Sequence, residues 1–122
     1  MNIEFFDNPL QVPNSREDVR IRQLGLYMYD DRRRFAVGFD ITPFLEPPSI
    51  EVIATDEAGN EVSSLHVIEA NDKNFSLTMH IRDNESEKLT VRATLYYATP
   101  ETERVDVHTI ERPLHITQPG EQ

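Results

Sequence analysis

The chain has 122 residues, of which 38% are hydrophobic and 28% are charged, and this composition suits one globular domain and is too apolar for a fully disordered chain. The absence of cysteine excludes disulfides, thiolate catalysis and cysteine-ligated zinc or iron–sulfur centres. Acidic residues number 22 and basic residues 12, and the net charge of −10 argues against nucleic acid or an anionic membrane as the main partner.

The first residues of the sequence contain neither a basic n-region nor an apolar h-region, so we expect no targeting segment. No window approaches the roughly 20 consecutive apolar residues that a membrane helix needs. We therefore expect a cytoplasmic protein, with a mature piece of a secreted or cell-surface protein as the alternative.

Residues 1–17 form a predicted N-terminal extension that is too apolar to remain unpacked in solvent. Burial of one large apolar side chain is worth about 1.5–3 kcal/mol, so we expect this segment to pack on the domain as an extra strand or to cover a neighbouring subunit. Its apolar residues are Ile3, Phe5, Phe6, Leu10 and Val12. We expect a β-domain over residues 18–116 and a frayed tail over residues 117–122.

Apolar residues at every second position are the strongest signal in the sequence, and this spacing is typical of half-buried strands. Val19 and Ile21 are out of phase with the run that begins at Leu24, which predicts a bulge near Gln23. The segment 61–70 also fits a helix at three-residue spacing, but its β-branched residues and the preceding Gly59 favour a strand. The predicted strands are 18–29, 35–42, 49–55, 61–68, 74–82, 88–97 and 104–112.

The links between these strands predict two sheets. Residues 30–34 and 98–103 are short and polar, as hairpin turns are, and residues 56–60 form a tight turn in which Gly59 can take a positive φ. Residues 42–49 are too long and too rich in proline for a hairpin, which predicts a crossover between sheets. The expected fold is therefore an all-β, antiparallel sandwich of about seven strands with an N-terminal extension.

This order of hairpins and crossovers resembles that of fibronectin type III and related immunoglobulin-like domains. The stretch from Ile50 to Asn60, IEVIATDEAGN, is similar to a hairpin common in bacterial immunoglobulin-like modules. The resemblance covers roughly residues 18–112 and implies a fibronectin type III-like sandwich.

No catalytic pattern is evident in the sequence. The histidines, His66, His80, His108 and His115, lack metal-ligand spacing, and we expect His80 and His108 on outward faces, although a zinc site assembled from several strands is left open. Ser63 and Ser64 lie too close to His66 along one strand for triad geometry, and neither GxSxG nor a glycine-rich phosphate loop occurs. We expect neither enzymatic activity nor a cofactor.

Acidic links and tyrosines are the candidates for ligand binding. Sandwich modules gather calcium ligands from loops at one end, but the links at 30–31, 56–60 and 98–103 are not all expected at the same end. Tyr27, Tyr29 and Tyr96 are predicted to face outward, yet strands from different sheets cannot form one sugar-binding platform. We therefore expect the tyrosines to cover apolar neighbours.

Charge is distributed unevenly along the chain. Residues 16–34 carry a net charge of +2, whereas residues 35–122 carry −10. Arginines on an edge strand discourage aggregation between sheets; alternatively, they dock an acidic surface such as another copy of the chain, which predicts salt-sensitive self-association. Phe44 and Leu45 are expected either to plug the end of the sandwich or to form a small docking knob.

The sequence thus predicts a non-catalytic protein-interaction or structural module, whose partner is another protein or a second copy. The alternative is a module that binds calcium, lipid or carbohydrate through loops at one end of the sandwich. The predicted interaction surface consists of Arg20, Arg22, Arg32, Arg33, Arg34, Phe44 and Leu45.

Overall fold

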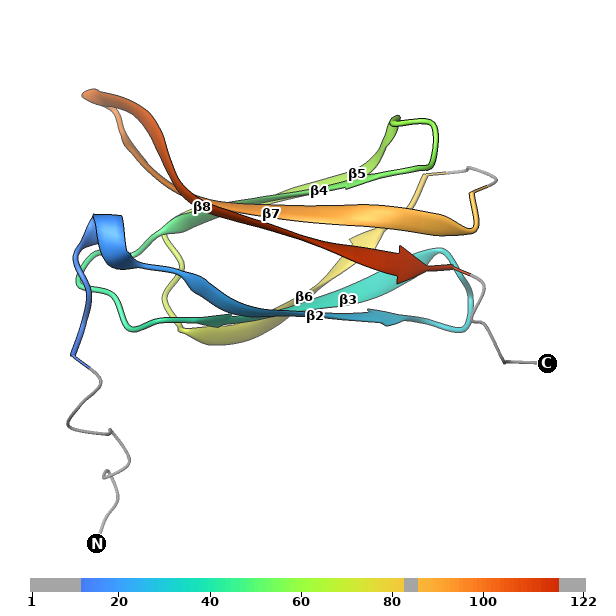
Figure 1. The fold of residues 1–122 in the computed structure, drawn as a ribbon, viewed down its shortest axis with the longest axis horizontal. Coiled ribbons are helices and arrows are strands. Elements are labelled where there is room, and N and C mark those ends of the chain that lie inside the picture. The colour runs from blue at the N-terminus through green and yellow to red at the C-terminus, as the bar shows by residue number, and fades with distance from the viewer. Residues whose placement is uncertain (1–11, 83–85, 117–122) are drawn as a thin grey trace, which may run out of the picture.

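The computed structural model describes residues 12–82 and 86–116, and these form two antiparallel sheets packed face to face (Figure 1). One sheet has three strands in the order β2-β3-β6, and the other has four in the order β5-β4-β7-β8. No helix among these residues has the length and hydropathy to cross a membrane. The elements are η1 (Arg16–Asp18), β2 (Ile21–Met28), β3 (Arg34–Ile41), β4 (Ser49–Thr55), β5 (Glu61–Val67), β6 (Asn74–His80), β7 (Lys88–Thr99) and β8 (Thr102–His115).

The predicted all-β sandwich of seven strands is confirmed, including the ambiguous strand β5. Every second residue of β3 is buried, because alternate side chains of a strand point to opposite faces of the sheet. The same alternation holds along the first half of β7. The fully buried side chains at the centre of the two layers include Phe35, Val37, Ile41, Ile50, Val52, Leu89, Val91 and Leu95.

The connections also follow the prediction. Three hairpins, β2–β3, β4–β5 and β7–β8, each join neighbours in one sheet, while the other links cross between sheets. In the β4–β5 turn Gly59 has a φ of 90°, a conformation that residues with a Cβ rarely adopt. The carboxylate of Asp56 accepts hydrogen bonds from the backbone N–H groups of Ala58 and Asn60, which holds the turn closed.

Two of the four register shifts in the sheets bear on side chains near the edge strands β2 and β8. The predicted bulge near Gln23 is confirmed, since Ile21 pairs with Ile41 but Gln23 pairs with Asp40. A second shift was not predicted: Leu95 pairs with His108 and Tyr96 with Asp106, so that Val107 is an extra residue in β8.

The prediction that His108 faces outward is therefore wrong. As the cross-strand partner of Leu95 it points to the inner side, where its Nδ1 accepts a hydrogen bond of 2.9 Å from the N–H of Ile21. This bond joins the edge strands of the two sheets. Burial, followed by the charge of Arg20, lowers the pKa of His108.

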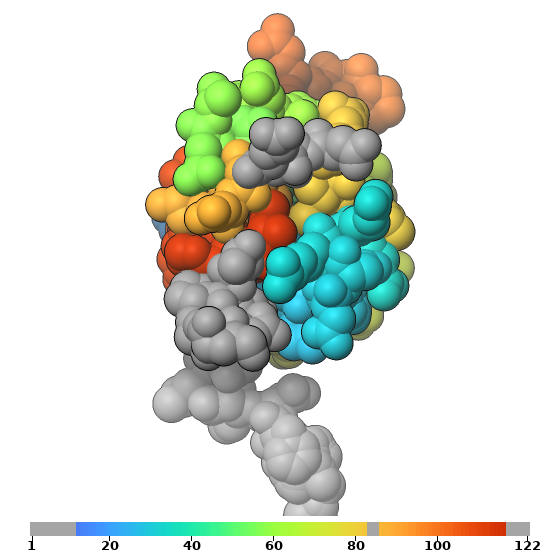
Figure 2. All heavy atoms as spheres, turned by 90° about the vertical axis from the view of Figure 1, so that its right-hand side faces the viewer, coloured from blue at the N-terminus to red at the C-terminus, as the bar shows by residue number. Residues whose placement is uncertain are grey.

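The β7–β8 hairpin extends beyond the sandwich and curves away from the three-stranded sheet (Figures 1 and 2). Val105 lies on this hairpin, within the predicted strand 104–112, and is 60% exposed, although its spacing from Val107 is that of side chains on one face of a strand. The reason is that the facing sheet ends before this point. Only Val107 reaches the edge of the core.

The chain before β2 crosses the same end of the sandwich. Asn14 forms a parallel bridge with Phe44, and the N–H of Leu45 donates to the carbonyl of Asn14. The predicted packing of the N-terminal extension concerns mainly residues 1–11, and these lie outside the described residues, as does the predicted tail of residues 117–122.

Candidate functional site

The predicted interaction surface is divided between the two ends of the sandwich. Arg32 and Arg33 lie in the β2–β3 turn, beside a hollow of about 260 Å³ that also includes Ile81 and Ile116. Figure 2 views this end, with the β2–β3 turn in cyan. Phe44 and Leu45 follow the other end of β3, so the structure does not bring them together with Arg32, Arg33 and Arg34. Phe44 packs against the core, whereas Leu45 is 66% exposed.

Neighbouring acids and carbonyl groups engage several of the predicted arginines. Arg22 contacts Asp40 at 2.9 Å, and Arg34 contacts Asp31 at 2.8 Å. Arg20 donates hydrogen bonds to the backbone carbonyls of Glu17 and Val19. The hydrogen bond from the Arg33 N–H, and then that from Arg34, lowers the pKa of Asp31. The excess positive charge of residues 16–34 is thus largely matched within the domain, which weakens the case for an acidic partner at this surface.

The tyrosines are on different sheets, as predicted. Tyr27 is in β2 of the three-stranded sheet and Tyr29 directly follows this strand; their rings lie edge to face at 5.4 Å, and the guanidinium of Arg34 lies 4.5 Å from the centre of the Tyr29 ring. Tyr27 is 58% exposed; Tyr96 also faces outward, as predicted, but it is only 6% exposed. Side chains from neighbouring strands cover its ring.

These covering side chains form a polar network on the outer face of the four-stranded sheet. The Tyr96 hydroxyl lies 3.1 Å from Nδ1 of His66, and Arg104 lies over the Tyr96 ring at 4.1 Å. Arg104 also donates hydrogen bonds of 2.7 Å to both Glu51 and Asp106. The bond to Asp106 is the main cause that raises the pKa of Arg104. The network joins β4, β5, β7 and β8 and fixes their outer side chains.

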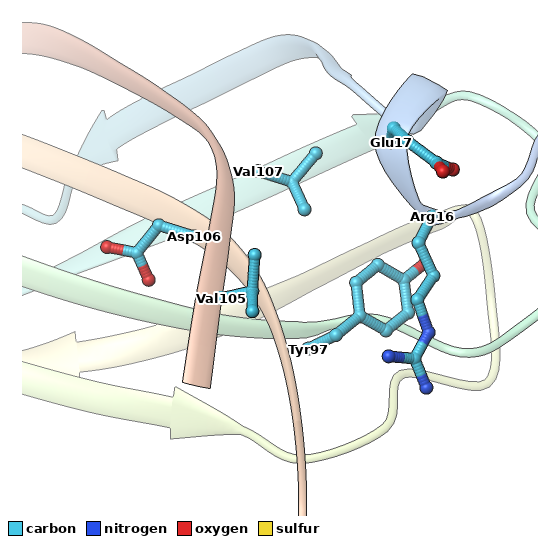
Figure 3. Close-up of a pocket in the computed structure, with 6 residues that line it drawn as sticks. All are labelled: Arg16, Glu17, Tyr97, Val105, Asp106 and Val107. Atoms are coloured by element: carbon cyan, nitrogen blue, oxygen red, sulfur yellow. The ribbon is translucent and has the colours of Figure 1, made fainter. Parts of the chain in front are cut away.

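A cleft of about 350 Å³ lies at the end of the sandwich that carries η1, between η1 and the base of the β7–β8 hairpin (Figure 3). Tyr97 and Arg16 lie side by side in it, with the guanidinium 4.9 Å from the ring centre. Asp106 points to the opposite side of β8 from Val105 and Val107. The residues that line the cleft are Arg16, Glu17, Tyr97, Val105, Asp106 and Val107.

Polar contacts hold one wall of this cleft in place. Arg16 forms an ion pair of 2.6 Å with the carboxylate of Glu46. The Tyr97 hydroxyl donates a hydrogen bond of 2.8 Å to the backbone carbonyl of Glu46. Burial, and then the charge of Glu46, raises the pKa of Tyr97 to about 12, so the hydroxyl remains protonated and remains a donor at neutral pH. The wall is therefore fixed before any partner arrives.

Exposed apolar side chains lie at the end of the sandwich that carries the cleft, and Val105 is the one among them that lines it. Val12 and Leu45 are each 66% exposed and Val105 is 60% exposed. Leu45 is bonded through its backbone to Asn14 and adjoins Glu46, so it lies at the same end as the cleft. We call this region the end surface, and it consists of Val12, Arg16, Leu45, Tyr97, Val105 and Val107. The sequence indicated Leu45. Tyr97 belongs to the hydrophobic core, as its place in the alternating run of the predicted strand 88–97 implies, and it also lines the cleft.

The remaining candidates do not converge. Among residues 12–82 and 86–116, no three His, Asp or Glu side chains lie close enough to hold a metal ion. The acidic links at 30–31 and 56–57 lie at the end opposite the β7–β8 hairpin, as Figure 1 shows. A further acidic link, at residues 83–85, lies outside the described residues. No protein-family model and no curated protein matches the chain.

Proposed function

We propose that the chain is a fibronectin type III-like domain that acts as a non-catalytic protein-interaction module. The sheet orders β2-β3-β6 and β5-β4-β7-β8 support the fold assignment, because they give the three-plus-four arrangement with hairpins and a crossover that the sequence resemblance implies. The sequence contains no tryptophan, and Phe35 and Phe39 are the large aromatic side chains that β3 contributes to the core.

The end surface supports the interaction role. Three aliphatic side chains at this end of the sandwich are 60–66% exposed, and exposed apolar surface with a polar rim is typical of protein interfaces. In the cleft the apolar part is Val105, Val107 and the edge of Tyr97, while Arg16 and Glu17 supply a rim of both signs. The exposure of Val105 on the projecting hairpin is the observation that carries the proposal.

The chemistry of the cleft defines the partner. A volume of about 350 Å³ is large enough for one or two side chains. Its apolar walls favour an aliphatic or aromatic side chain, and Arg16 and Glu17 favour polar groups of both signs beside it. The partner is therefore a protein segment that inserts an apolar side chain between η1 and the β7–β8 hairpin.

Site-specific photo-crosslinking tests this function in the cell of origin. A photoreactive amino acid at Val105 is expected to give a discrete crosslinked product, and a product of twice the monomer mass identifies a second copy as the partner. The matched control places the same group at Glu111, which is exposed on the same strand but outside the cleft.

A second substitution links the product to the end surface. Leu45→Asp in the Val105-labelled protein is expected to abolish the product without lowering the melting temperature, because Leu45 is 66% exposed. Equal products from Val105 and Glu111, or no product from Val105, would overturn the proposal.

A further inference from the structure

The sandwich is open along one side. β5 and β6 are the edge strands of the two sheets there, and a hollow of about 310 Å³ lies between them. At one end the N–H of Arg82 donates a hydrogen bond of 2.9 Å to the carbonyl of Val62 and joins the two edges. The apolar side chains that β5 and β6 direct toward the core on this side are in part only half-buried: Leu65, Val67, Phe75 and Leu77.

The edge of β6 presents backbone groups that no strand uses. The N–H of Ile41 donates to the carbonyl of Lys73, and the N–H of Ile81 donates to the carbonyl of Arg33. Because hydrogen-bonded residues alternate along an antiparallel strand, β3 takes up the odd-numbered residues of β6. The N–H and C=O groups of the even-numbered residues point away from β3, and within the described residues they have no backbone partner along β6: Asn74, Ser76, Thr78 and His80.

β6 lacks the features that protect other edges of the two sheets. β8 carries Pro113 and charged residues over most of its length, and β2 has a register shift and a charged residue, Arg22, near its start. β6 has the sequence NFSLTMH, without proline, glycine, aspartate, glutamate, lysine or arginine. A neutral, regular edge is a template for pairing with another strand, which natural domains usually prevent.

The sequence of β6 is complementary to itself. When two β6 strands run antiparallel with Leu77 opposite Leu77, Asn74 lies opposite His80 and Ser76 lies opposite Thr78. All the outward-pointing residues then form hydrogen-bonded pairs, and each pair exchanges two backbone hydrogen bonds. A shift by two residues in either direction leaves an outward residue without a partner. Strand geometry therefore selects one register.

The side chains agree with this register. Asp72 and Arg82 each lie five residues from Leu77, so opposite charges of the two copies meet at both ends of the pairing. On the inner face, Phe75 of one copy lies opposite Met79 of the other, and Met79 lines the hollow between β5 and β6. No two like charges face each other along the strand.

We propose that two copies of the chain pair through β6 and join their three-stranded sheets into one sheet of six strands. The twofold axis is perpendicular to this sheet, so the half-buried side chains of both copies lie on the same side of it. β6 is only about 23 Å long, which gives a small interface, and we expect a dissociation constant of about 10–500 μM. This surface is separate from the end surface and from the arginines of the β2–β3 turn.

Sedimentation equilibrium of the full-length protein between about 10 μM and about 1 mM tests the pairing. The average mass is expected to rise toward that of a dimer at both about 0.15 M and about 1 M NaCl, because most of the bonds are between uncharged backbone groups. A monomer at 1 mM would overturn the proposal, as would a dimer that weakens more than about tenfold at the higher salt concentration.

Paired charges test the register. Ser76 and Thr78 are exposed, so neither double variant is expected to lower the melting temperature. Ser76→Lys with Thr78→Lys places like charges opposite each other and is expected to weaken the dimer about tenfold, although it lowers the net negative charge of each copy. Ser76→Lys with Thr78→Glu, the matched control, places opposite charges there and is expected to keep the dimer or strengthen it. Equal dimers from both variants would contradict the register.

Cysteine crosslinking locates the contact directly, because the sequence contains no cysteine. Ser76→Cys and Thr78→Cys proteins, mixed under mild oxidation, are expected to form mainly the mixed disulfide dimer. Gln23→Cys on the β2 edge is the control and is expected to remain monomeric, while Val105→Asp at the end surface is expected to leave the mixed product unchanged. Crosslinking that is as efficient at Gln23 as at β6, or its loss in Val105→Asp, would refute pairing through β6.

Discussion

The hydrogen bond from Tyr97 to the carbonyl of Glu46 joins β7 to the crossover between the sheets, and Tyr97→Phe removes only this bond. The ring remains, together with its contact with Arg16 and its burial at 5% exposure. The change therefore isolates one hydroxyl group. It tests whether a side chain at the end of β7 anchors the link that carries Leu45.

The expected loss follows from the geometry. A neutral hydrogen bond contributes about 0.5–1.5 kcal/mol to folding, and the 2.8 Å length between partly buried groups places this one near the middle of the range, at about 1 kcal/mol. With a urea dependence of about 2 kcal/mol per molar for a domain of this size, the unfolding midpoint falls by about 0.5 M.

Urea unfolding at neutral pH, followed by circular dichroism, measures this loss. Tyr27→Phe is the matched control, because Tyr27 is 58% exposed and its hydroxyl makes no hydrogen bond within the described residues. The difference between the two variants is expected to exceed about 0.5 kcal/mol. If Tyr97→Phe unfolds at the same midpoint as the control, the bond does not anchor the crossover and the reasoning is refuted.

The same hydroxyl gives the protein an alkaline pH dependence. The folded pKa of about 12 lies above the ordinary value of 10.0, so the contribution of Tyr97 is fully present below pH 10 and is lost as pH rises toward 12. The midpoint of the wild type is therefore expected to fall more between about pH 8 and about pH 11 than that of Tyr97→Phe. An equal fall in both proteins would show that the hydroxyl is not protected in the folded state.

Three further substitutions test other parts of the structure. His108 has a pKa lowered from 6.5, so its contribution to stability is present above that pH and is lost as the pH falls through the lower folded value. The wild type is therefore expected to lose part of its melting-temperature advantage over His108→Gln between about pH 7.5 and about pH 5. A constant advantage would contradict the bond to Ile21. Leu95 is fully buried, so Leu95→Ala is expected to lower the free energy of unfolding in urea by about 2–5 kcal/mol. Val105 is 60% exposed, so Val105→Ala is expected to lower it by less than about 0.5 kcal/mol. Similar losses would mean that Val105 is packed against the rest of the domain. Gly59→Ala introduces a Cβ at a φ of 90° and is expected to cost about 1 kcal/mol or more, measured by thermal unfolding, while an unchanged melting temperature would show that the turn can relax.

The strands and their sheets could be predicted from the sequence because alternation depends only on neighbours in the chain. The bulge near Gln23 could be predicted because the alternation of apolar residues changes phase between Ile21 and Leu24. The bulge at Val107 is defined by the pairing of β8 with β7, and the sequence of β8 alone does not specify that pairing. The direction of His108 was therefore assigned wrongly.

The predicted surface shows the same limit. Counting charges along residues 16–34 finds an arginine-rich segment, but the acid that pairs with Arg22 comes from the adjacent strand, at Asp40. Likewise, Tyr96 is covered by Arg104 and His66, which lie on β8 and β5. The cleft, which needs η1 and the β7–β8 hairpin together, has no contiguous signature in the sequence. Its apolar residues follow the spacing of a core.

The two long strands β7 and β8 also imply uneven protection of their amides against hydrogen exchange. In the body of the domain, β7 is flanked on both sides by β4 and β8, so its amides there open only with the whole domain. Beyond Tyr96 the partner β4 has ended, and the tip around Thr99 and Thr102 depends on a single ladder. One pair of strands thus spans the most and the least cooperative parts of the molecule, and the tip can readjust without loosening the core.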